Sequence, residues 1–250
     1  MNYEAVLSEV DGEGVRTITL NRPSSLNAMN HALVRDVAQA FRDADQDAAT
    51  KAIIFTGAGR AFCAGDDRRE HVHPDTEAEA RAFVETIQDA TRAIVHGDKP
   101  VVGAINGWAV GGGFEWAINC DFSIWAESAR AFFPEVSLNL FVTGGVTALL
   151  PALVGLNTAR EMLFLGEKYD AATLKRLGVA WRVVPDASLI REARAVARKL
   201  AGLPPLSVRA MRRTIYRTAM TDLATALQLE SEATVRGFLD PETTRRLKNF

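Results

Sequence analysis

Short apolar runs separated by a long amphipathic segment constrain the fold of this chain most. The segments 52–55 (Ala-Ile-Ile-Phe) and 101–105 (Val-Val-Gly-Ala-Ile) are each predicted to be a short buried strand. Between them, a helix is expected from Asp75 or Thr76 to about Val95, and Lys99-Pro100 ends it. The first two-thirds of the chain alternate strands and helices in this way, which is typical of an α/β protein.

The flanking segments are also consistent with an α/β protein. A hairpin is predicted at the start, with strands 6–10 and 15–20 around Asp11-Gly12-Glu13-Gly14. Asn30 can cap a helix that runs to about Asp45. Further short strands are expected at 122–125, 131–133 and 183–184. From Gly144 the pattern is mostly helical, with two or three helices after Ser188 and without a convincing repeat.

Composition excludes several classes of protein. The chain has 250 residues, enough for one large domain or a domain with an appendage, and a formal net charge of −2. This charge does not suggest a general nucleic-acid or anionic-membrane partner. Two cysteines, Cys63 and Cys120, make a poor disulfide scaffold, no secretory signal is visible, and no apolar stretch reaches the ~20 residues of a membrane span. A reduced, cytoplasmic protein is expected.

The glycine run 111–113 is the first candidate site. Glycines between a buried strand and a helix start let a ligand approach the backbone closely, and the N–H groups of a helix start favour negative charge. A tight strand-to-helix turn without a ligand is the alternative. A second glycine-bearing loop, 56–67, follows the strand 52–55 and offers further backbone donors.

Two glutamates stand in apolar surroundings near these loops. Glu115 follows Phe114 in the first turn of the expected helix, and Glu135 follows the run 132–134 (Phe-Phe-Pro). Either could be an exposed residue at the end of an element. If both are buried, their pKa values are raised, which suits general acid–base chemistry near neutrality. Together with the backbone donors, they could hold an oxyanion and move protons beside it.

Other motifs have both a functional and a purely structural interpretation. The loop after Phe55 starts like a dinucleotide-binding fingerprint, but Phe62 stands in place of the third glycine. The segment His71-Val72-His73, with Glu70 and Asp75, is read as a solvated loop in preference to a metal cluster. No Gly-x-Ser-x-Gly elbow is present. Basic residues in 191–199, 209–217 and 245–248 form either solvated helix faces or a local anion site, such as one for the phosphates of a cofactor-like substrate.

The chain resembles the enoyl-CoA hydratase/isomerase family, also called the crotonase superfamily. The resemblance covers nearly the whole chain and rests on these segments: Asn21-Arg22-Pro23 with Leu26-Asn27-Ala28, the loop 62–67, the stretch 107–121, Pro134-Glu135, and the stretch 171–185 that ends in Val-Val-Pro. It implies an α/β fold, a crotonase-like spiral of strand–strand–helix units. It also implies a core domain over 1–200 and a C-terminal helical trimerisation region over 201–250, with trimers commonly paired into hexamers.

The resemblance also implies roles for individual residues. Glu115 and Glu135 match the two catalytic glutamates, and the N–H groups of Ala64 and Gly112 would form the oxyanion hole for the thioester oxygen of an acyl-CoA. The residues that would contact substrate or its coenzyme A part are Leu26, Ala28, Ala64, Gly65, Asp66, Asp67 and Gly111. No metal and no cofactor is implied, since coenzyme A enters as part of the substrate.

Several positions depart from the family pattern. After Glu135, Asn139 and Val142 replace a glycine and a proline, and the segment 143–146 (Thr-Gly-Gly-Val) stands for a glycine-rich turn. Leu149 stands where an arginine is usual, Arg68 replaces an apolar residue, and the C-terminal segment 244–250 also differs. The retained pair of glutamates favours hydration of an enoyl-CoA. Isomerase, dehydratase or hydrolase activity, and a non-catalytic acyl-CoA-binding protein, remain alternatives.

Overall fold

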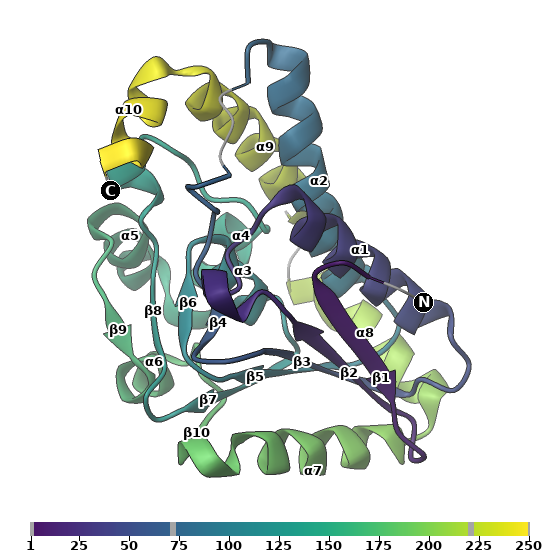
Figure 1. The fold of residues 1–250 in the computed structure, drawn as a ribbon. Coiled ribbons are helices and arrows are strands. Elements are labelled where there is room, and N and C mark those ends of the chain that lie inside the picture. Colours follow the sequence, from purple (N-terminus) through teal and green to yellow (C-terminus); the bar gives the residue numbers. More distant parts are fainter. Residues whose placement is uncertain (1–2, 71–73, 220–222, 250) are drawn as a thin grey trace.

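A computed structural model describes residues 3–70, 74–219 and 223–249 (Figure 1). The larger sheet has the strand order β1-β2-β3-β5-β7-β10. Its strands are β1 (Val6–Val10), β2 (Val15–Leu20), β3 (Ala52–Gly57), β5 (Val101–Ile105), β7 (Phe122–Ala126) and β10 (Arg182–Val184). The hairpin partners β1 and β2 are antiparallel, and all the other neighbouring strands are parallel. Every residue of β3 and β5 is buried, as their apolar runs predict.

A second sheet has the order β4-β6-β8-β9. Its strands are β4 (Ala61–Cys63), β6 (Trp108–Val110), β8 (Arg130–Phe132) and β9 (Tyr169–Asp170). The first three are parallel to one another, whereas β9 runs antiparallel to β8. Parallel neighbours end at the same edge of a sheet, so the segments that follow β6 and β8 begin side by side. These are the segments that carry the two glutamates.

The same strand–strand–helix unit occurs three times along the chain. A strand of the larger sheet is followed by a strand of the smaller sheet and then by a helix: β3-β4-α2, β5-β6-α3, and β7-β8-α4. The helices are α2 (Glu77–His96), α3 (Gly112–Ile118) and α4 (Val146–Val154), with a short 3-10 helix η2 (Glu135–Leu138) before α4. The predicted α/β spiral of strand–strand–helix units is confirmed.

Side-chain caps set the starts of the two long N-terminal helices. Helix α1 (His31–Gln46) begins after Asn30, whose side-chain oxygen accepts a hydrogen bond from the Leu33 N–H at 2.9 Å. Helix α2 begins after Thr76, which caps the Glu79 N–H. Both predicted starts are confirmed. Two further 3-10 helices, η1 (Pro23–Ser25) and η3 (Asp186–Ser188), lie in connections.

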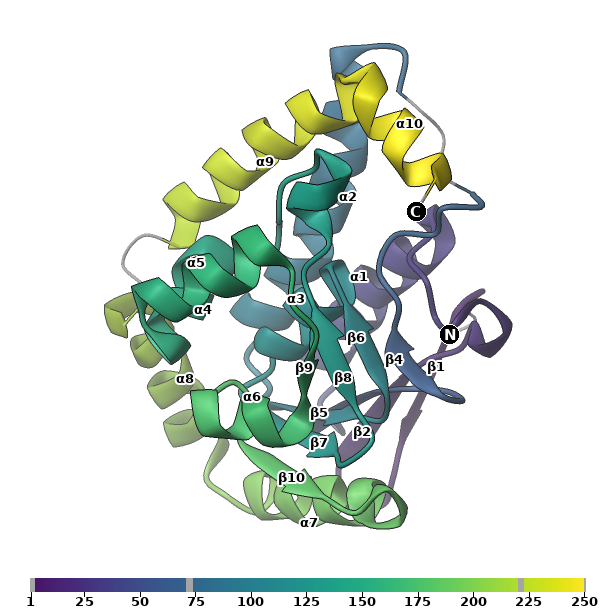
Figure 2. The ribbon, with the colours of Figure 1, turned by 90° about the vertical axis from the view of Figure 1, so that its left-hand side faces the viewer.

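The last third of the chain is helical, as predicted, but has more helices than expected. It contains α5 (Leu156–Leu165), α6 (Ala171–Leu177), α7 (Leu189–Ala201), α8 (Pro205–Ala219), α9 (Leu223–Leu239) and α10 (Pro241–Asn249). The expectation of two or three helices after Ser188 was wrong, because α7 to α10 all follow it. Helix α7 covers one face of the larger sheet, and α9 lies along α2 (Figures 1 and 2).

The C-terminal helices pack against the rest of the same chain. Arg212 of α8 is 6% exposed, pairs with Asp121 at 2.8 Å, and donates to the carbonyl oxygens of Ile94, Val95 and Gly97 at the end of α2. Leu227 of α9 belongs to the main hydrophobic core. A trimerisation role for residues 201–250 stays a prediction. Among the described helices, none is long and apolar enough to cross a membrane.

Candidate active site

Helix α3 positions the first glutamate. Gly111 precedes the helix with a φ of 52°, a backbone conformation that favours glycine, and its C=O accepts from the N–H groups of Phe114 and Glu115. A side chain at Gly111 would also collide with the Glu135 carboxylate. Glu115 therefore lies in the first turn of α3, where it is 2% exposed. Of the two alternatives that the sequence left open for Glu115, the buried one is correct.

Thr143 satisfies both oxygens of Glu115. The Thr143 N–H donates to Oε1 at 2.8 Å, and the Thr143 hydroxyl donates to Oε2 at 2.6 Å. Burial raises the pKa of Glu115 above its ordinary value, and the two hydrogen bonds offset part of that rise because they favour the ionised form. In the sequence, Thr143 is recognisable only as the first residue of the segment 143–146, which replaces a glycine-rich turn.

Glu135 lies on the other side, at the start of η2. Its side chain is 9% exposed, and its Oε2 is buried without a hydrogen-bond partner among the described residues. Burial raises the pKa of Glu135 well above its ordinary value, and the negative charge of Glu115 raises it further. The two carboxyls are therefore close enough to interact, and ionisation of one disfavours ionisation of the other.

The glycine-bearing loop after β4 lies beside this pair. Gly65 packs so closely on β6 that a Cβ atom would be 2.9 Å from the Val110 carbonyl oxygen. Gly112 faces Met29, whose Sδ would be 2.7 Å from a Cβ atom there. The structure thus brings the loop 64–67, the segment 26–29 and the start of α3 together, as the sequence predicted.

Individual residues of this loop have defined roles in the fold. The Ala64 N–H donates to the Leu26 carbonyl oxygen at 3.1 Å, so this donor is already engaged. Asp67 pairs with Arg22 at 2.8 Å, and Arg22 also donates to the Ala28 carbonyl oxygen. Asn27 is fully buried and donates to the carbonyl oxygens of Ala58 and Ala61. The early Asn-Arg-Pro and Leu-Asn-Ala segments therefore fix the loop, and substrate contacts of Leu26, Ala28 and Asp67 stay predictions.

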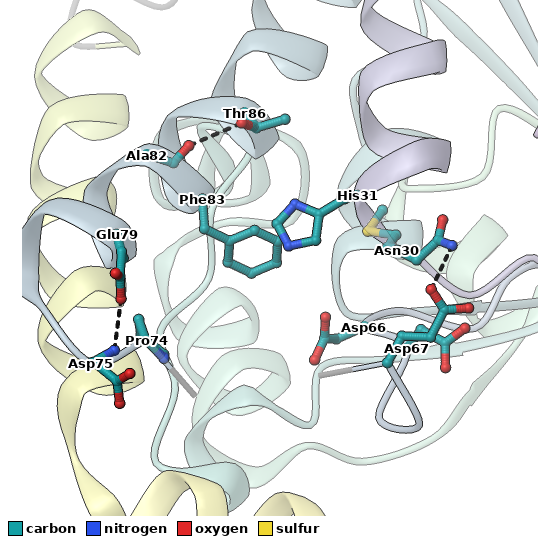
Figure 3. A pocket seen from close by; sticks show the side chains of 12 residues that line it. Asn30, His31, Asp66, Asp67, Pro74, Asp75, Glu79, Ala82, Phe83 and Thr86 are labelled. Carbon is teal, nitrogen blue, oxygen red and sulfur yellow. Dashed lines mark hydrogen bonds between the residues drawn. The ribbon is translucent and has the colours of Figure 1, made fainter. Parts of the chain in front are cut away.

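A pocket of about 510 Å³ opens next to the loop (Figure 3). Met29 and Asp66 line it on the side of the loop, and His31 and Phe83 line it from α1 and α2, with ring centroids 4.8 Å apart. Asp67, Glu70, Asp75 and Glu79 add acidic side chains. Arg22 pairs with two of these carboxylates, Asp67 and Glu70, and so neutralises part of the charge of the lining.

The other candidate motifs do not form a site in the described part of the chain. His71, Val72 and His73 lie outside the described residues. Glu70 accepts hydrogen bonds from Arg22 and Asn30. No cluster of His, Cys, Asp and Glu that could hold a metal ion occurs within 3–70, 74–219 and 223–249. Cys63 and Cys120 are free and buried, as expected for reduced thiols.

Comparison with known proteins agrees with the fold. The family model described as enoyl-CoA hydratase/isomerase matches residues 11–244. The chain is 34% identical over 234 residues to the short-chain-enoyl-CoA hydratase of Clostridium acetobutylicum, covering 93% of this chain and 89% of that protein. It is 32% identical over 235 residues to the 1,2-epoxyphenylacetyl-CoA isomerase of Escherichia coli, covering 92% and 88%.

A solved structure extends this likeness to the whole chain. The crystal structure of an enoyl-CoA hydratase/isomerase from Mycobacterium paratuberculosis superimposes with a TM-score of 0.93 at 27% identity, covering 100% of both chains. The match reaches from the N-terminal hairpin to the C-terminal helices, so all the elements that surround Glu115 and Glu135 are included. The chain therefore belongs to the enoyl-CoA hydratase/isomerase family.

Proposed function

We propose that this protein is an enoyl-CoA hydratase that adds water across the 2,3 double bond of an enoyl-CoA thioester. The observation that carries the proposal is the pair of buried carboxyls in unequal surroundings. Glu115 accepts two hydrogen bonds from Thr143, whereas Oε2 of Glu135 has no partner among the described residues. Addition of water needs one ionised and one protonated group, and this pair supplies both.

The surroundings assign the two roles. Hydrogen bonds to a carboxylate favour its ionised form, so Glu115 is the general base that takes a proton from water as the oxygen bonds to C3. Glu135 holds its proton because it is buried beside the charge of Glu115. It is the general acid that protonates C2 of the resulting enolate. One proton thus passes from water to Glu115 and another passes from Glu135 to C2, so the elements of water are added across the double bond.

Backbone N–H groups stabilise the enolate oxygen in this scheme. Gly112 offers one donor at the start of α3. Ala64 would have to give up its bond to Leu26 to serve as the second. Met29 and Asp66 form a parallel β-bridge. The Met29 N–H donates to the Gly65 carbonyl oxygen, and the Asp67 N–H donates to the Met29 carbonyl oxygen. In this pattern the Asp66 N–H points away from Met29, so it is better placed than that of Ala64.

The remaining features of the enzyme follow from the same chemistry. The acyl-CoA contacts the loop 64–67, Leu26, Ala28 and Gly111. Carboxyl groups and backbone donors perform every step, so the reaction requires no metal or redox cofactor. A homotrimer, or a dimer of trimers, is the expected assembly. Two free, buried cysteines suit a cytoplasmic enzyme.

An isomerase is the second candidate, because the matching family and a similar solved structure are described as enoyl-CoA hydratase/isomerase. Isomerisation moves a proton between carbon atoms and needs only one of the two carboxyls. A hydratase depends on both of them.

Hydration of crotonyl-CoA, followed by loss of the enoyl absorbance, tests the proposal. We expect Glu115→Gln and Glu135→Gln each to lower kcat by about 10²–10⁴-fold, since each removes a positioned base or acid. The double variant should lose less than the product of the two, because both groups act on one water. Glu9→Gln, an exposed change on β1, is the control.

Two results would redirect the assignment. Isomerisation of an enoyl-CoA without hydration of crotonyl-CoA, lost in only one of the two glutamine variants, would indicate a one-carboxyl isomerase. No turnover of any acyl-CoA by the parent protein would favour an acyl-CoA-binding protein.

A further inference from the structure

Helix α4 begins without a cap of its own. Its N-cap residue is Gly145, which has no side chain, and the first N–H groups of a helix need partners. Glu230 of α9 supplies them from a distance of 85 residues along the chain. The Gly145 N–H donates to its Oε2 at 2.7 Å, and the N–H and hydroxyl of Thr147 donate to its Oε1 at 2.8 and 2.6 Å.

The capped turn is the one that holds Glu115. It spans residues 143–147, and Thr143 at its start donates both hydrogen bonds to the Glu115 carboxylate. Gly144 is fixed as well, because its N–H donates to Gln88 Oε1 and its carbonyl oxygen accepts from Asn119 Nδ2. Helices α2, α3 and α9 therefore hold this turn from three sides.

Helix α9 is fixed in turn by α2. Gln88, which is fully buried, donates through Nε2 to the Leu227 carbonyl oxygen and to the Ser231 hydroxyl. Gln88 of α2 thus contacts both the turn and α9, and Glu230 of α9 contacts the turn directly. Figure 2 shows α9 and α2 side by side above α4.

Glu230 itself is fully buried. Burial raises its pKa to about 8, and the charge of Glu115 contributes to the rise, while the donors of Thr147 and Gly145 oppose it. A carboxyl in this setting is costly to bury unless its partners are fixed. Three donors from a single turn meet that condition, so the side chain and the turn hold each other in place.

We propose that Glu230 is a positioning residue for the reaction, which holds the turn 143–147 so that Thr143 presents both of its donors to Glu115. It does not contact the substrate and acts only through the turn. This inference rests on the proposed role of Glu115 as the general base. It gives the C-terminal helix α9 a part in catalysis within its own chain.

Loss of Glu230 has two expected effects. The turn moves, so Glu115 is no longer aligned with the attacking water, and kcat falls by about 10–100-fold, as for a displaced catalytic group. KM changes little because the substrate-binding loop is untouched. Weaker hydrogen bonds from Thr143 also raise the pKa of Glu115 further, since these bonds favour its ionised form. Glu135 and Cys63, which also face Glu115, are unchanged. The carboxylate of Glu230 acts in the opposite sense, because loss of its negative charge favours ionised Glu115.

The test compares Glu230→Ala and Glu230→Gln with Glu232→Gln, the same chemical change on the same helix outside this network. The Glu115 carboxyl carbon is followed by ¹³C NMR against pH and assigned with Glu115→Gln, and kcat and KM are measured for crotonyl-CoA. We expect a lower kcat in both Glu230 variants and parent values in Glu232→Gln. Both Glu230 variants lose the charge and only alanine loses every acceptor, so the titration midpoint should be higher in Glu230→Ala than in Glu230→Gln. In a Thr143→Ala background, Glu230→Ala should have a smaller effect on the midpoint, because only the backbone N–H donor of residue 143 remains.

The design separates the possible failures. An unchanged midpoint and kcat in a folded Glu230 variant would overturn the proposal and leave Glu230 with a structural role. If Glu230→Ala does not fold, Glu230→Gln decides, because it keeps one oxygen for Thr147 and places an amide N–H₂ against the Gly145 N–H. If the parent hydrates no enoyl-CoA, the proposed function fails, and the NMR titration still tests the link from Glu230 to Glu115.

Discussion

Two residues of the same type reach different states here because their neighbours differ. Glu115 and Glu135 are both nearly inaccessible to solvent, so desolvation acts on both. Both oxygens of Glu115 accept hydrogen bonds from one residue, Thr143, whereas Oε2 of Glu135 has no partner among the described residues. The proposed division into base and acid therefore depends on a threonine that itself exchanges no proton with the substrate.

Replacement of Thr143 by valine should shift the pH dependence of hydration. The change removes the hydroxyl donor and keeps the N–H donor, so the ionised form of Glu115 loses stabilisation and its pKa rises further. Hydration needs ionised Glu115, so the acid limb of kcat/KM moves to higher pH. A hydrogen bond to a charged group is worth ~1.5–3 kcal/mol, which corresponds to roughly one to two pH units.

Thr143→Ser is the matched control, since serine keeps the hydroxyl. It should leave the acid limb where the parent has it. An acid limb that does not move in Thr143→Val would mean that this hydroxyl does not control the ionisation of Glu115.

The sequence predicted the two glutamates but not their supporting residues. Glu115 and Glu135 stand out because apolar neighbours surround them in the chain itself. Thr143 lies 28 residues from Glu115, and its role arises only when the fold brings them together. Glu230 stands in the polar stretch Gln228-Leu229-Glu230-Ser231-Glu232, which resembles a solvated helix face. No local signal distinguishes it from its exposed neighbours.

At the scale of elements, long helices could be predicted from the sequence, whereas strands of two or three residues could not. Helices α1 and α2 have a capping residue and an apolar stripe, so their starts could be placed within a residue or two. Strands β4 and β6 have three residues each and β9 has two, which is too short to display a period. The second sheet could therefore not be derived from the residues alone, although it places both glutamates.

The turn before α4 can be tested with glycine substitutions. Gly144 has a φ of 70°, and a Cβ atom there would be 2.9 Å from Cβ and Oε2 of Glu115. Gly144→Ala should lower the free energy of unfolding by about 1–2 kcal/mol through the left-handed backbone alone. It should also displace Glu115 and reduce kcat by about 10–100-fold. Urea unfolding and crotonyl-CoA hydration measure the two effects.

Gly178→Ala provides the control for backbone strain. Gly178 has a φ of 89°, and the nearest atom to a Cβ there is the Leu153 carbonyl oxygen at 3.3 Å, away from both glutamates. It should lose stability and keep its kcat. Equal kcat values in the two variants would show that the space around Gly144 has no bearing on Glu115.

At the scale of the whole molecule, the C-terminal helices have two kinds of surface. Their inner side completes the core through Arg212, Leu227 and Glu230. Their outer side exposes large apolar residues, with Leu206 67% and Met211 63% exposed. Deleting residues after Gly202 would therefore remove buried contacts together with the exposed ones, and loss of assembly in such a protein could follow from unfolding alone.

Surface substitutions on α8 test the expected trimer without disturbing the core. Met211 and Ile215 line an apolar groove of about 610 Å³ with Leu153 and Leu203, and exposed apolar patches of this kind are typical of subunit interfaces. The double change Met211→Glu with Ile215→Glu places two charges in that groove, so a trimer or hexamer should dissociate toward monomers in light scattering, with the circular dichroism of the parent. Leu7→Glu, a 50% exposed position on β1, should leave the assembly intact. If the mass of the α8 variant equals that of the parent oligomer, this face is not the subunit interface, and the trimerisation role predicted for residues 201–250 loses its main support.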